Sequence, residues 1–191
     1  MEKLNREQVL ARAADTGDLM GVDLGGLDLS EAILPRVDFR DANLEGTNFR
    51  EADLTEAEFR DAKMNGADFS GAKLERAVLI GARIVGARFD GAHMVGAFLN
   101  GTAASGASFR KADLRAARIG VPRFQSDDPF AAVTSFEGAD MTWSLFGEAD
   151  LTGVDLRNAN LSHAHMYETE MRSALLDGAD LTGVRLKRVT V

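Results

Sequence analysis

Residues 62–91 read AKMNG ADFSG AKLER AVLIG ARIVG ARFDG, six five-residue units that each have an apolar residue at the centre. The same period runs from Leu24 to Phe124 and again from Phe136 to Val191. Of 33 central positions, 31 are Leu, Phe, Met or Ile, and 21 have Ala two positions earlier. An α-helix repeats its apolar face about every 3.6 residues and a half-buried strand about every two, so neither accounts for this period. The chain must turn at regular intervals.

The simplest geometry makes each unit one side of a polygon. The central residue and the small residue two positions before it then point inward, while the other three positions face water. Of the 19 Gly, 14 lie two positions after a centre, as Gly66 and Gly81 do, where a tight corner favours a residue that can adopt positive φ. A fixed period of this kind indicates a solenoid, in which each unit packs on its neighbours in the stack.

The commonest unit here, A(D/N)LxG, is typical of a known family. Residues 52–56 (ADLTE), 67–71 (ADFSG) and 149–153 (ADLTG) superpose on it, and the pattern closely resembles the pentapeptide-repeat family over residues 24–191, apart from one interruption. The resemblance implies an all-β fold, a right-handed quadrilateral β-helix with four pentapeptides per coil. For this chain we expect about eight coils.

A four-sided helix requires that residues 20 apart in sequence lie on one face. With faces numbered from Leu24, large rings fall on two faces, and Leu, Met or Ile occupies most centres of the other two. Such alternation fills a square interior without overpacking. Face two carries Phe49, Phe69, Phe89 and Phe109, and face four carries Phe39 and Phe59.

Residues 1–18 lack the period and are expected to form a short N-terminal capping α-helix over residues 5–16. Asn5 is a good N-cap, Gln8 completes a capping box, and Gly17 is a stop signal. The helix would cover the first coil, because an uncovered coil exposes apolar surface and unpaired strand edges. A partner-binding helix is the alternative.

The interval between Phe124 and Phe136 is 12 residues where five are expected, which implies an insertion of seven. We therefore divide the repeats into a first array at residues 19–124, an inserted loop at 125–135, and a second array at 136–191 that continues the same solenoid. The loop carries Asp127, Asp128, Pro129 and Phe130. Loops on rigid scaffolds often carry function, so these residues are candidates for partner binding. A tolerated insertion, with its Phe folded back, is the alternative.

A second candidate for partner binding follows from the 20-residue stacking. Trp143, His163 and Gly183 should occupy one corner of successive coils, with Tyr167 near the next corner. Trp143 and Tyr167 are the single Trp and Tyr of the chain, and both fall at positions expected to face outward. Trp and Tyr are enriched at binding hot spots.

The composition argues against catalysis. The chain has three His and no Cys, and no Ser/His/Asp arrangement or phosphate-binding loop rises above the repeat. His163 and His165 have no evident third partner for a metal. No charged residue occupies an inward position. We therefore expect no enzyme activity, no catalytic residue, no metal and no cofactor.

The last coil should expose an apolar edge formed by Leu176, Leu181, Leu186 and Val191. A second copy stacked end to end would cover this edge, so we expect a homodimer through the C-terminal coil.

The net charge of −8 is unevenly distributed. Residues 24–79 and 125–184 are acidic, whereas residues 80–124 carry seven bases and two acids. Direct nucleic-acid binding is not expected at this acidity. The sequence has no 20-residue apolar run and no signal segment, so we expect no membrane span and a cytoplasmic protein.

These features favour a non-catalytic protein-binding scaffold with a rigid, rod-like surface. The family resemblance implies an alternative, since its quinolone-resistance branch consists of acidic, dimeric rods that mimic DNA and protect or modulate a type II topoisomerase, DNA gyrase. This chain is similar in length, charge and single loop, but its basic middle band and the lack of a C-terminal helix differ. A third reading is an accessory protein of a bacterial secretion system, which some repeat proteins with a short N-terminal helix resemble.

Overall fold

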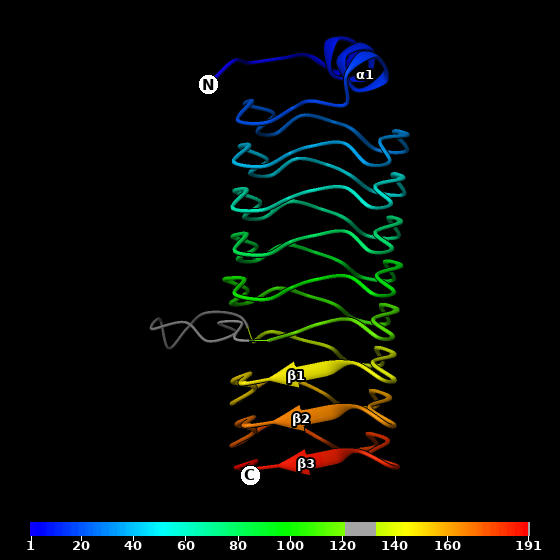
Figure 1. Cartoon of the computed structure of the whole chain (residues 1–191), viewed down its shortest axis with the longest axis vertical. Coiled ribbons are helices and arrows are strands. Elements are labelled where there is room, and N and C mark those ends of the chain that lie inside the picture. The colour runs from blue at the N-terminus through cyan, green and yellow to red at the C-terminus, as the bar shows by residue number, and fades with distance from the viewer. Residues whose placement is uncertain (121–132, 191) are drawn as a thin grey trace.

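The computed structural model describes residues 1–120 and 133–190, which form a stack of coils with a helix at its N-terminal end (Figure 1). Helix α1 spans Arg6–Asp15, and three short strands lie near the other end: β1 Leu145–Gly147, β2 His165–Tyr167 and β3 Arg185–Lys187. The strands form a parallel sheet in the order β1-β2-β3, and each residue pairs with the one 20 positions further along. One coil therefore takes four pentapeptides.

The other coils are joined by isolated parallel bridges with the same offset of 20, such as Asp18↔Asp38, and Lys3 before helix α1 is bridged to Asp23 in the same way. Across residues 121–132 the offset becomes 27, as in Ser108↔Ser135 and Arg118↔Leu145. The difference of seven equals the interruption in the five-residue period. The coils on the two sides of residues 121–132 are therefore hydrogen-bonded to each other in one continuous ladder.

Stacked phenylalanine rings fill two sides of the interior. On face two the ring centroids of neighbouring coils lie 4.9, 4.9, 4.9 and 4.7 Å apart from Phe49 to Phe136, and the planes are nearly parallel. On face four Phe39 and Phe59 stack at 5.1 Å. These distances match the ~4.8 Å separation of paired strands, so each ring packs directly on the ring of the next coil.

The corners impose positive φ on whichever residue follows a centre by two. Gly66 and Gly81 adopt φ of 65° and 72° there, but Glu31, Trp143 and His163 adopt it as well, at 57°, 62° and 60°. For a non-glycine residue this conformation costs about 1 kcal/mol or more. The hydrogen bonds between coils hold the corner in place whichever residue occupies it.

The residue before each centre supports the same corner, which explains why Asp and Asn are common there. Its side-chain oxygen accepts a hydrogen bond from the backbone N–H two residues later, as at Asp28 (Ser30 N, 3.0 Å) and Asn160 (Ser162 N, 3.0 Å). At Asp155 the side chain of Arg157 also donates, and these hydrogen bonds hold the pKa of the Asp155 carboxyl below its ordinary value. We call the local structure closed by this side-chain-to-backbone hydrogen bond, from the N–H two residues later, the corner turn.

Helix α1 begins with a capping box. The Asn5 side chain accepts from Gln8 N at 2.9 Å, and the Gln8 side chain accepts from Asn5 N at 2.9 Å. After the helix, Gly17 adopts φ of 68° and donates to the carbonyl of Arg12. Val9 is fully buried against the core, and Arg6 donates to the backbone oxygens of Asp28 and Ser30. These contacts attach the helix to the first coils.

Candidate functional site

Trp143 and His163 form an aromatic pair on one corner. Their rings stack with centroids 4.6 Å apart and planes 13° from parallel, and Trp143 is 52% exposed. In the next coil the corner residue is Gly183, where an added Cβ would lie 2.6 Å from His163 Nδ1. The glycine therefore leaves room for the His163 ring to lie over the corner. The structure places these two predicted residues in direct contact.

Tyr167 lies apart from this pair, on β2 in the outward strip of face four. It is 40% exposed, and Lys187 Nζ lies 5.3 Å from the centroid of its ring. A hydrogen bond between the Tyr167 hydroxyl and the Glu168 carboxylate raises the pKa of Tyr167. Glu168 is also paired with Arg188 at 2.7 Å. No ring contact joins Tyr167 to Trp143 or His163 among the residues that the structure describes.

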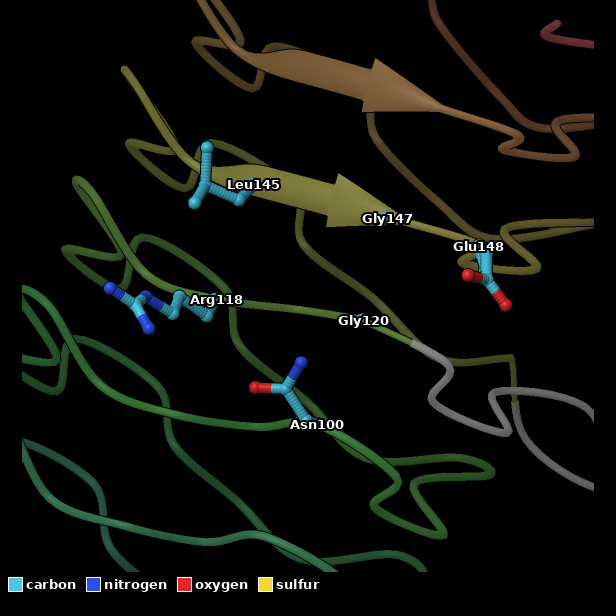
Figure 2. Close-up of a pocket in the computed structure, with 6 residues that line it drawn as sticks. All are labelled: Asn100, Arg118, Gly120, Leu145, Gly147 and Glu148. Carbon is cyan, nitrogen blue, oxygen red and sulfur yellow. The ribbon is translucent and has the colours of Figure 1, made fainter.

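A pocket of about 280 Å³ lies on face four near β1 (Figure 2). Arg118 lies at one side of it and Glu148 at the other, and Asn100 points toward Gly120. The Arg118 guanidinium carbon lies 5.0 Å from the centroid of the Phe98 ring, on the neighbouring coil. None of its lining residues was predicted from the sequence to be a site residue. The residues that line it are Asn100, Arg118, Gly120, Leu145, Gly147 and Glu148.

The apolar end of the stack is the other exposed feature. Leu181 is 44% and Leu186 63% exposed, and Leu176 is partly buried. Together with Met166 and Met171 they line an apolar hollow of about 150 Å³. Val191, the fourth residue assigned to this edge, lies outside the described residues.

The loop candidates Asp127, Asp128, Pro129 and Phe130 also lie outside the described residues. Within residues 1–120 and 133–190, no three His, Cys, Asp or Glu side chains are grouped so that they could hold a metal ion. In the same ranges no helix has the length and apolarity needed to cross a membrane.

Comparisons with known proteins agree on the architecture. The family model for pentapeptide repeats matches in eight copies, which together cover residues 18–119 and 134–190. HetL, a pentapeptide repeat protein involved in heterocyst differentiation regulation in the cyanobacterium Nostoc sp. strain PCC 7120, superposes with a TM-score of 0.63. It is 26% identical, and the alignment covers 98% of this chain and 94% of HetL.

A trypsin-treated variant of QnrB1, a plasmid-mediated fluoroquinolone resistance protein, superposes with a TM-score of 0.61. It is 24% identical over 97% of this chain and 88% of QnrB1, a likeness that shows the fold alone. A comparison of the sequence with curated proteins found no match.

Proposed function

Because the chain belongs to the pentapeptide-repeat family, whose members fold as right-handed β-helices, we propose that it is a non-catalytic scaffold that binds a protein partner along one side of its rod. The observation that carries the proposal is that the single Trp and the single Tyr of the chain are both exposed. Trp143 lies at the corner before face four, and Tyr167 lies on the outer surface of that face. Trp and Tyr are enriched among the few residues that contribute most of the binding energy at protein interfaces.

The rod suits this role because it is rigid before binding. Each coil is hydrogen-bonded to the next through parallel bridges, so the aromatic side chains are held on a fixed backbone. Preorganisation of this kind reduces the entropy lost on association. We include the acidic segment Asp127, Asp128, Pro129 and Phe130 as a second contact, because in sequence it follows Gly120, a residue of face four. We further propose a cytoplasmic location, in agreement with the lack of Cys.

We also propose a homodimer in which two copies stack through the apolar end formed by Leu176, Leu181 and Leu186. The exposed leucines and the hollow beneath them support this arrangement. Contact between two such ends would remove apolar surface from water, worth about 25 cal/mol per Å². It would also set the last coils of the two copies against each other, with their facing strands antiparallel because the same end of each copy meets.

A second candidate is binding to a type II topoisomerase. The acidic bands on a long rod and the net charge of −8 favour it. The basic band at residues 80–124 interrupts the resemblance to DNA, since complementarity to a DNA-binding groove needs a continuous negative surface. We therefore rank topoisomerase binding below the general scaffold. The affinity capture described next decides between the two, because it identifies the partner.

Affinity capture from a lysate of the source organism tests the scaffold. Replacing both Trp143 and Tyr167 with Ala should reduce recovery of the partner by about tenfold or more, because two hot-spot side chains are lost. Ile33→Ala is the control, since Ile33 is 76% exposed at a distant coil of face three. Recovery should be unchanged for the control. Equal recovery by the double variant and the wild type would contradict the proposal.

A further inference from the structure

On face four, the residues that come just before the central residues form a column on the outer surface. After its first coils this column departs from the repeat, because it lacks the Asp and Asn that the repeat has at this position elsewhere. In the first coils Asp18 and Asp38 make the corner turn, accepting from Met20 N and Arg40 N at 3.0 Å. From the fourth coil onward no Asp or Asn returns to this position over six described coils. On the other three faces the sequence returns to Asp or Asn after at most four such positions. The six residues, each bridged to the next, are Val78, Phe98, Arg118, Leu145, His165 and Arg185.

This departure has an energetic cost. Each lost corner turn removes a hydrogen bond whose net contribution is about 0.5–1.5 kcal/mol. Apolar side chains such as Leu145, which is 39% exposed, gain little in return from a position that faces water. The column is therefore not explained by the stability of the coil. It is better explained by a partner that covers it.

The column and its neighbours combine cations with apolar side chains. Arg118 lies over the Phe98 ring and Lys187 over the Tyr167 ring. Among the described residues, Arg118 and Arg185 form no ion pair, although Arg residues elsewhere on the rod commonly do. Their guanidinium groups remain available to carboxylates from another molecule.

The pocket described above lies on the same face, beside Arg118 and Leu145 of this column. Gly120 and Gly147 have no side chains, and they leave an opening of about 280 Å³ between Arg118, Leu145 and Asn100 (Figure 2). The opening is large enough for one or two side chains. Its lining offers a guanidinium, a carboxamide and an apolar side chain, and the Glu148 carboxylate lies at the side opposite Arg118. A carboxylate flanked by an apolar residue therefore fits at the Arg118 side of the opening, next to Leu145.

We propose that face four, from Phe98 to Lys187, is the docking surface for an extended acidic segment of the partner protein. The inference rests on the proposed scaffold function and names the chemistry of its partner. Carboxylates of the segment pair with Arg118 and Arg185, and its apolar side chains pack on Leu145 and Tyr167. On the residues just before and just after the centres, this face carries Arg118, Arg185 and Lys187 and no acid, while Glu148 and Glu168 lie at its corner. The three cations attract an acidic segment to these positions.

The spacing of the cations specifies the segment further. Arg118 and Arg185 lie three coils apart in the ladder, through Leu145 and His165. At ~4.8 Å per coil and ~3.3 Å per residue of an extended chain, this distance corresponds to about four residues. The segment should therefore carry two acidic residues about four positions apart, with apolar residues between them.

Selection from a phage-displayed library of random 12-residue peptides tests the proposal on the full chain. Selected peptides should be enriched in Asp and Glu at this spacing. By fluorescence anisotropy, Arg118→Glu should weaken their binding about tenfold or more, and Arg118→Gln should weaken it less. The control is Arg83→Glu, which makes the same charge change at the same repeat position on face one and should alter binding by no more than about twofold.

Several outcomes would overturn the docking surface: no selected peptide, peptides without acidic enrichment, or equal losses for the variants at positions 118 and 83. Arg118-dependent binding of a 20-base-pair DNA duplex at near-physiological salt would assign the face to nucleic acid instead. If the docking surface fails but the Trp143/Tyr167 variant still loses its captured partner, the scaffold function stands with a different contact. If no partner is captured at all, the scaffold function itself fails.

Discussion

Replacing Phe89 with alanine is expected to lower the free energy of unfolding by about 3–5 kcal/mol. The Phe89 ring is fully buried and stacks between Phe69 and Phe109 at centroid distances of 4.9 Å on each side. The surrounding backbone cannot move inward to fill the cavity, because every coil is bridged to the coils above and below it. The substitution therefore loses the buried ring and leaves most of its volume empty.

Denaturant unfolding followed by circular dichroism measures this effect. Ile33→Ala is the control, since Ile33 is 76% exposed and its loss should change the free energy of unfolding by no more than about 0.5 kcal/mol. A loss below about 1 kcal/mol for Phe89→Ala would show that the continuous ring stack does not stabilise the rod as described.

The second large effect is expected at the apolar end of the stack. Replacing Leu181 and Leu186 together with glutamate should convert the proposed dimer to a monomer. Stacking two ends would bury four added carboxylates against an apolar hollow, and burial of an unpaired charge costs several kcal/mol. Light scattering at micromolar concentration should report a change from twice the mass of the chain to the mass of one chain.

Ile33→Glu serves as the control for the added charge, because Ile33 lies on the side of the rod at the other end. It should leave the mass at that of a dimer. A wild-type protein that is already monomeric at micromolar concentration would contradict the proposed dimer directly, whatever the variants do.

Much of the fold could be predicted from the sequence because the five-residue period is set by the core. The centre and the small residue before it are the positions that must fit a narrow interior, so their spacing in sequence fixes their position in space. The same rule predicts that Phe136 returns to face two after the insertion. In the structure Phe136 stacks on Phe109 at 4.7 Å.

Face four could not be predicted in this way, because the period describes what points inward and the docking surface points outward. The net charge summed along the whole of face four does not reveal the docking surface either. Acids such as Asp38 and Asp61 in the first coils of this face offset the bases Arg185 and Lys187 in the last ones. The signal was present in the single column before the centre, where Asp and Asn stop returning after Asp38. The loss of Asp and Asn from this column indicates a special surface only once the structure shows that Asp or Asn at this position forms the corner turn.

For the Trp143 and His163 pair, too, the period predicts one feature and leaves another unpredicted. Their 20-residue spacing predicts a shared corner, and the rings do stack there. The role of Gly183 could not be predicted, because it depends on the His163 ring lying over the next corner. Spacing therefore places residues reliably, whereas the contacts between their side chains require the structure.

In-cell photocrosslinking from position 145 tests most directly whether face four is the binding side of the scaffold. Benzoylphenylalanine at Leu145 should give one discrete protein adduct that disappears when Arg118→Glu is added. The same group at Ile33, which occupies the same repeat position on face three, should give no such adduct. Adducts of equal yield from both positions, or an adduct from position 33 with none from position 145, would contradict the account.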